Sequence, residues 1–175
     1  MLLISNNCED IGVPYPKEAV IRINTAWVNT RADLIKELVK LKDYDIYLDY
    51  PIGRSKPPLP QITWDDLYYT VNEFTNIKYF AWSNAENTDS LEFARMKLPE
   101  RVMLVPKIET LIGVLHIEKI IKAAKTKLIM IDKEDLATAS KTPELYLHFL
   151  EYARNKAKEL NVECIELKGV IFADS

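Results

Sequence analysis

Cysteine, histidine and glycine are scarce in this chain, and each scarcity excludes a class of site. The 175 residues include two cysteines, Cys8 and Cys164, which lie far apart and form no metal-spaced pair. The two histidines, His116 and His148, are too few for a histidine-rich metal centre. The four glycines form no GxGxxG or GxxxxGK loop, so neither nucleotide-binding fingerprint can be proposed.

Long apolar runs and a strong charge imbalance are also missing. No run approaches the ~20 apolar residues of a membrane span, and the sequence does not open with a signal-peptide pattern. A net charge of −3 gives no electrostatic attraction to nucleic acid or to an anionic membrane surface. We therefore expect a cytoplasmic protein with reduced thiols, without nucleic-acid or membrane partners.

The chain does contain the composition of one globular domain. Hydrophobic residues make up 48% and charged residues 28% of the sequence, which is enough apolar material for a sizeable core. No internal repeat, low-complexity tract or domain boundary interrupts residues 1–175. A single domain is therefore predicted.

Short apolar strands alternate with amphipathic helices along the chain. Each strand is a brief β-branched or aromatic run, which is typical of a parallel sheet covered on both faces. Helix N-cap signals stand at Thr30, Thr63 and Thr142, the last followed by proline. The alternation predicts an α/β fold with right-handed crossovers. The expected strands are residues 1–5, 19–24, 45–50, 77–83, 101–109, 127–132 and 162–167.

The chain is short for a closed barrel. Six or seven strand–helix units fit into it, whereas a closed eight-stranded barrel typically needs ~250 residues. We expect a shortened or incomplete TIM-type (β/α) barrel of mostly parallel strands, with an open sheet or a barrel completed by a partner chain as alternatives. Missing strands would leave sheet edges and apolar helix faces uncovered, so a homo-oligomer is expected.

Charged residues stand at the C-terminal ends of two neighbouring apolar strands. Lys107 and Glu109 share a face of their strand because residues two apart point the same way, and Asp135 follows the next strand. Two carboxylates that converge there would suit Mg²⁺, which takes oxygen ligands and keeps several waters. The alternative is structural, with Lys107 and Glu109 as an ion pair and Asp135 in a solvated helix start.

Ordered motifs across residues 19–140 resemble the phosphoenolpyruvate/pyruvate superfamily of barrels. The motifs are AVIRINTAW, DIYLDYPIGR, VMLVPKIETLIGV and KLIMIDKEDLA. The EDLA motif and the later YARNKAKELNVECIELKGVIFAD look more like the HpcH/HpaI aldolases and the citrate lyase beta-subunit. The lysine before Ile-Glu and the LDYPIGR loop are similar to pyruvate kinase.

The resemblance implies a set of site residues. It implies Mg²⁺ or Mn²⁺ ligands at Glu109 and Asp135, and Arg22 as the cation that binds a substrate carboxylate or carbonyl. A planar guanidinium suits that role, although a structural salt bridge inside the sheet is the alternative. The resemblance also implies Asn24 as a secondary polar contact and Lys107 as the cation that offsets developing negative charge.

A proline-rich stretch, residues 50–61, is expected to form a surface loop at the C-terminal end of a strand. Such loops carry the chemistry in α/β barrels. Arg54 in this loop is a candidate contact for an anionic substrate, and a merely solvated loop is the alternative.

The activity implied by the resemblance is that of a Mg-dependent carbon–carbon lyase or aldolase. It would act on a 2-oxo acid or an acyl-CoA through a metal-stabilised enolate. One alternative is phosphoryl transfer on phosphoenolpyruvate, as in pyruvate kinase. Another is a degenerate, non-catalytic scaffold or binding subunit that oligomerises. The last alternative is favoured by Asp132, Lys133 and Glu134, which stand where superfamily members usually have glycine.

Overall fold

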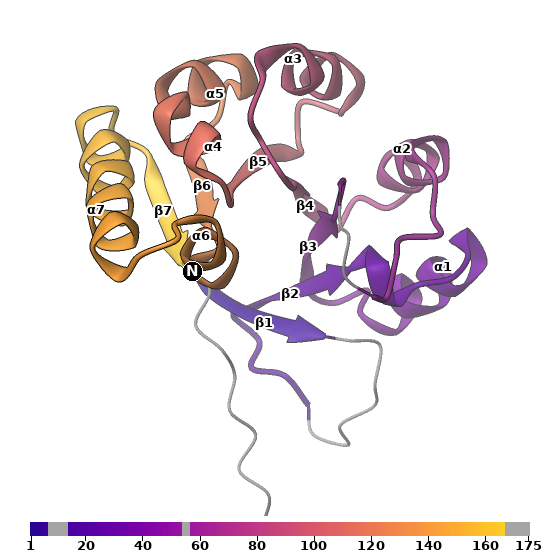
Figure 1. The fold of residues 1–175 in the computed structure, drawn as a ribbon. Helices are drawn as coiled ribbons and strands as arrows, with labels where there is room; N and C mark the ends of the chain where they lie inside the picture. Colours follow the sequence, from indigo (N-terminus) through magenta and orange to yellow (C-terminus); the bar gives the residue numbers. More distant parts are fainter. Residues whose placement is uncertain (7–13, 54–56, 167–175) are drawn as a thin grey trace, which may run out of the picture.

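The computed structural model describes residues 1–6, 14–53 and 57–166 (Figure 1). Its seven strands form one sheet in the order of the sequence, and every neighbouring pair is parallel. This confirms the predicted α/β class and the location of all seven expected strands. The strands are β1 (Leu2–Asn6), β2 (Ala19–Asn24), β3 (Asp45–Tyr50), β4 (Ile77–Trp82), β5 (Met103–Ile108), β6 (Leu128–Ile131) and β7 (Glu163–Glu166).

Most of the helices lie around the outside of the curved sheet, whereas the helix of residues 133–139 lies at its inner side (Figure 1). The three N-caps expected from the sequence are present. Thr30, Thr63 and Thr142 each accept a hydrogen bond from the backbone N–H three residues later, and Thr63 completes a capping box with Asp66. The helices are η1 (Thr25–Trp27), α1 (Arg31–Lys40), α2 (Trp64–Glu73), α3 (Thr88–Lys97), α4 (Leu111–Leu115), α5 (Ile117–Ala124), α6 (Lys133–Ala139) and α7 (Pro143–Glu159).

The sheet is an open half-barrel. The amino group of Met1 lies 3.9 Å from Glu163 Oε1, so the amino ends of β1 and β7 approach each other. No strand pairing joins β1 to β7 within the described ranges. The structure therefore supports a curved sheet of seven parallel strands, and it does not show a closed TIM-type barrel.

Alternate residues of each strand serve two separate apolar clusters. The larger cluster lies between the sheet and the helices and includes Ile21 and Ile23 of β2 with Leu34 and Leu38 of α1. The smaller cluster lies on the face turned away from the helices and consists of strand residues. Its buried members are Val20, Tyr47, Ala81, Val105, Leu128 and Met130.

The inner cluster determines where the charged residues lie. Moving two residues along a strand keeps the same face, so the residue two positions after each inner apolar side chain also faces inward. The apolar layer is therefore followed, toward the carboxyl ends of the strands, by a polar layer. That layer, called the inner polar layer below, consists of Arg22, Asp49, Ser83, Lys107 and Asp132.

No helix in the described part of the chain is both long and apolar enough to cross a membrane. Self-association of the open half-barrel stays a prediction.

Candidate functional site

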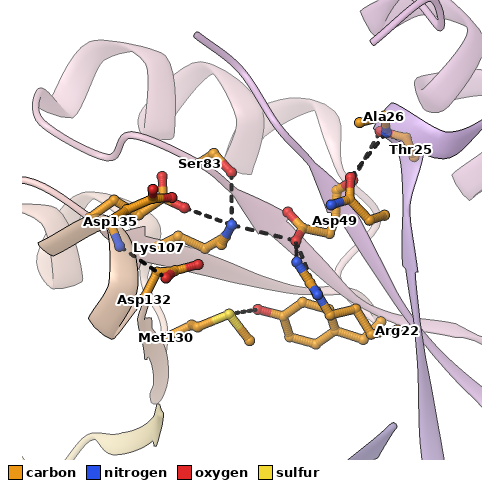
Figure 2. Close-up of polar contacts among 12 residues, drawn as sticks. Arg22, Thr25, Ala26, Asp49, Ser83, Lys107, Met130, Asp132 and Asp135 are labelled. Carbon is orange, nitrogen blue, oxygen red and sulfur yellow. Dashed lines mark hydrogen bonds and ion pairs between the residues drawn. The ribbon is translucent and has the colours of Figure 1, made fainter. Parts of the chain in front are cut away.

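Arg22 donates two hydrogen bonds to one oxygen of Asp49 inside the half-barrel, and the other oxygen, Oδ1, is buried without a hydrogen-bond partner among the described residues (Figure 2). Arg22 Nε and Nη2 donate to Asp49 Oδ2 at 2.9 and 2.5 Å, and Nη1 donates to Ser5 Oγ at 3.1 Å. Burial of Asp49 favours its neutral form, but Lys107 and Arg22 outweigh burial and lower the pKa of this carboxyl. Arg22 is thus held in the structural salt bridge that the sequence left open as an alternative.

Lys107 lies in the centre of the inner polar layer, 4% exposed. Its Nζ is 2.6 Å from Glu109 Oε1, 3.1 Å from Ser83 Oγ and 3.5 Å from Asp49 Oδ2 (Figure 2). Burial lowers the pKa of Lys107, but Asp49 and Glu109 together raise it by more, so the net shift of the pKa is upward. Lys107 is therefore an ammonium ion surrounded by three oxygen acceptors.

Glu109, immediately after β5, is engaged through both of its oxygens. Oε1 binds Lys107, and Oε2 accepts the backbone N–H of Asn84 at 2.7 Å. Burial raises the pKa of Glu109 more than Lys107 and the Asn84 N–H lower it. A carboxylate with a raised pKa binds a proton more readily than an exposed glutamate does.

The loops after β3 and β4 are joined beside this pair. Asn84 Nδ2 donates to the carbonyl of Ile52 at 2.6 Å, while its backbone N–H binds Glu109. Gly53 has a φ of +74°, and a Cβ at this position would come 3.0 Å from Asn84 Nδ2. The positive φ and this close contact both favour glycine there.

Three carboxylates converge at the carboxyl ends of β5 and β6. Oxygen atoms of Glu109, Asp132 and Asp135 lie within 4.8 Å of one another. Asp132 also caps α6, because its Oδ1 accepts the backbone N–H of Asp135 at 3.4 Å. An all-oxygen donor set of this kind suits a hard divalent cation.

These side chains surround a cleft of about 300 Å³ at the carboxyl edge of the sheet. Its floor is formed by four members of the inner polar layer, Arg22, Ser83, Lys107 and Asp132, and its walls by the loops after β3, β4 and β5 and by α6. Two cations, Arg22 and Lys107, line the cleft with the carboxylates of Glu109, Asp132 and Asp135, and a fourth carboxylate, that of Asp49, is buried against both cations. The cluster thus carries an excess of two negative charges when all six groups are ionised.

Five of the six candidate site residues from the sequence line the cleft. Arg22, Lys107, Glu109 and Asp135 all line the cleft. Asn24 lines it too, but its Oδ1 accepts the backbone N–H of Ala26 and caps η1. Arg54 lies outside the described residues.

Three further residues of the cleft region were missed as site residues. Asp49, Ser83 and Asp132 belong to the inner polar layer, and each follows an inner apolar residue by two positions. This spacing is the signal that could have identified them, because inner and outer residues alternate along every strand.

Comparisons with known proteins identify similarity in fold. No family model matches the chain, and a search of curated proteins finds no match. Among solved structures, the chain is similar to the 3-dehydroquinate dehydratase from Geobacillus kaustophilus HTA426, with a TM-score of 0.56 and 14% sequence identity. The alignment covers 84% of this chain and 62% of that one. At this identity the likeness concerns the fold.

These findings correct the expected family and activity. The resemblance to the phosphoenolpyruvate/pyruvate superfamily is wrong, since the similar structure is a dehydratase and no family model supports the motifs. The prediction of a Mg-dependent aldolase is wrong for the same reason, and the comparisons give no support to its kinase-like and scaffold alternatives. In the structure, Glu109, the expected metal ligand, is bound by Lys107 through one oxygen and by Asn84 through the other, so an ion at Glu109 would have to displace Lys107.

Proposed function

We propose that this chain is a lyase-type enzyme that removes water from a small hydroxylated carbonyl compound in the cleft. The observation that carries the proposal is the buried Lys107–Glu109 pair, 2.6 Å apart, at the floor of the cleft. Elimination of water next to a carbonyl needs a proton acceptor and a positive charge near the carbonyl oxygen. This pair supplies both.

Lys107 and Glu109 have different roles in the proposed reaction. The ammonium of Lys107 stabilises the negative charge that develops on the carbonyl oxygen when a neighbouring C–H proton leaves. Its raised pKa keeps it charged, which disfavours a role as an amine nucleophile. Glu109 accepts the proton, and its raised pKa brings it closer to the range of an effective general base.

The size of the cleft favours a small substrate. Its volume of about 300 Å³ lies at the lower end of the range found for ligand pockets. The similar fold of a 3-dehydroquinate dehydratase supports a dehydration and suggests 3-dehydroquinate as the first compound to test.

The test is a search for water loss from a panel of hydroxylated carbonyl compounds that includes 3-dehydroquinate. Product is detected by mass spectrometry and by the ultraviolet absorbance of the new conjugated double bond. The variants Lys107→Met and Glu109→Gln should lose turnover, whereas Lys122→Met on the surface should keep it. An inactive wild-type protein across the panel would refute the proposed function.

Binding of a divalent cation is a second candidate function of the same cleft. It is favoured by the convergence of Glu109, Asp132 and Asp135 and by the excess negative charge of the cluster. Bound Mg²⁺ or Mn²⁺ would supply Lewis-acid stabilisation of a substrate oxygen. The donor set fits such an ion, with the condition that the ion competes with Lys107 for Glu109.

Titration with Mn²⁺, followed by electron paramagnetic resonance, tests this candidate. Asp135→Asn should weaken binding, whereas Lys107→Met should strengthen it by removing the competing ammonium. Absence of binding to the wild-type protein at millimolar Mn²⁺ would exclude the cation site.

The finer predictions on architecture and environment remain part of this proposal. We infer that the half-barrel is an incomplete TIM-type barrel, supported by the approach of β1 to β7 at their amino ends. A cytoplasmic location and a homo-oligomeric state are expected with it. Analytical ultracentrifugation tests the oligomeric state directly, and a monomer at micromolar concentration would contradict it.

A further inference from the structure

Ser83 is a buried hydroxyl at the floor of the cleft. It is the first residue after β4 and 3% exposed, and its Oγ accepts a hydrogen bond from Lys107 Nζ at 3.1 Å (Figure 2). Its position, two residues after the inner apolar Ala81, places it in the inner polar layer. Ser83 also lines the cleft, so a ligand there can reach it.

The proton of the Ser83 hydroxyl is available to a ligand. A serine hydroxyl has one proton to donate and two lone pairs that accept, whereas an ammonium only donates. Ser83 must therefore accept from Lys107, and it donates to no other residue in the described part of the chain. The three protons of Lys107, in contrast, face Glu109, Ser83 and Asp49.

Other polar groups that line the cleft already donate their protons within the protein. The side-chain amide of Asn84 donates to Ile52, and its backbone N–H donates to Glu109. The hydroxyl of Thr138, at the opposite wall, donates to the carbonyl of Glu134. Ser83 is thus the cleft hydroxyl that combines a polarising cation on one side with an unused proton on the other.

We propose that Ser83 is a catalytic residue that donates the proton to the leaving oxygen, an inference that rests on the proposed function. In the dehydration, Glu109 takes the proton from the carbon next to the carbonyl, and the C–O bond breaks with its electron pair on oxygen. The leaving hydroxide takes the Ser83 proton and departs as water. Ser83 is reprotonated by Lys107, and Lys107 takes the proton that Glu109 received.

This proton relay among Glu109, Lys107 and Ser83 needs no proton from solvent. The substrate loses one hydrogen and one hydroxyl group as water, and the three side chains return to their starting protonation states. The contacts needed are present, 2.6 Å from Glu109 to Lys107 and 3.1 Å from Lys107 to Ser83. Lys107 donates the hydrogen bond and Ser83 accepts it, which is the direction of proton transfer that the relay requires.

The leaving group provides the test, because an acetate or fluoride ion departs without a proton and a hydroxide does not. Ser83→Ala should lower kcat about 10²-fold on a hydroxyl substrate, the lower range for general acid catalysis. The loss should largely disappear on the matching acetoxy or fluoro compound. Ser83→Thr, which keeps the hydroxyl, should restore activity, and Ser90→Ala on α3 is the matched control.

The outcomes separate this inference from the proposed function. If Ser83→Ala keeps the wild-type kcat while Lys107→Met is inactive, the role of Ser83 is overturned and the lyase proposal stands. An equal loss on both leaving groups would show a structural role and overturn the inference as well. If the wild-type protein is inactive on all substrates, both fall. Should Ser83→Ala fail to fold by circular dichroism, Ser83→Gly, which also lacks the hydroxyl, takes its place in the same comparison.

Discussion

Replacement of Lys107 by methionine gives the sharpest prediction about stability. Methionine keeps most of the side-chain volume but removes the charge from a site that is 4% exposed. Buried Glu109, at 2.6 Å, would lose its cationic neighbour, and buried Asp49, at 3.5 Å, would keep Arg22 alone. Removal of one partner from a buried ion pair typically costs about 3–5 kcal/mol, because the other charge stays buried.

The assay is urea unfolding at neutral pH, with thermal unfolding as a second measure. A loss of about 3–5 kcal/mol corresponds to a Tm lower by roughly 6–20 °C in a chain of this size. The double variant Lys107→Met/Glu109→Gln should recover part of the loss, because glutamine carries no charge to leave unpaired.

The chain contains a matched control for this experiment. Lys122 and Glu118 of α5 are also 2.6 Å apart, but both side chains are largely exposed. Exposed ion pairs contribute little to stability because water screens them. Lys122→Met should therefore leave the urea midpoint nearly unchanged. Equal effects of the two lysine substitutions would refute the reasoning that burial makes the Lys107 pair strong.

Three further predictions concern acid stability, the β3 loop and a helix cap. The lowered pKa of Asp49 stabilises the fold at pH values above its unfolded pKa of about 3.9, and this contribution is lost as pH falls through the folded pKa. The stability difference between wild type and Asp49→Asn should therefore shrink in urea unfolding below about pH 4, and a constant difference would contradict it. Gly53→Ala should lower the free energy of unfolding by about 1–3 kcal/mol, because of the positive φ and the contact with Asn84. The same assay measures it, and an unchanged stability would contradict this loop geometry. Thr63→Ala should cost about 0.5–2 kcal/mol through loss of the capping box, and an unchanged urea midpoint would contradict that cap.

The strands and the helix starts could be predicted from the sequence because their signals are local. The run AVIRIN at residues 19–24 is β-branched and apolar, and it forms β2 at those bounds. Thr63 and Asp66 stand three residues apart and form the expected capping box. Such patterns depend on neighbours along the chain, so one sequence is enough to read them.

The composition of the cleft was harder to predict because it depends on contacts across strands. Arg22 and Asp49 are 27 residues apart, and their contact requires the register that pairs β2 with β3 and the curvature that turns both side chains inward. The contact from Lys107 to Ser83 also crosses between strands, from β5 to the end of β4. The motif resemblance singled out Lys107 and Glu109, which line the cleft, but it named the wrong family.

Turnover that requires the Lys107–Glu109 pair is the central claim of the proposed function. The decisive measurement is the rate of water loss from the hydroxylated carbonyl panel with wild-type protein, Lys107→Met and Glu109→Gln, each verified as folded. We expect dehydration of at least one compound by the wild-type protein and background rates for both variants. Turnover by the variants at the wild-type rate, or no turnover by the wild-type protein on any compound, would contradict the account.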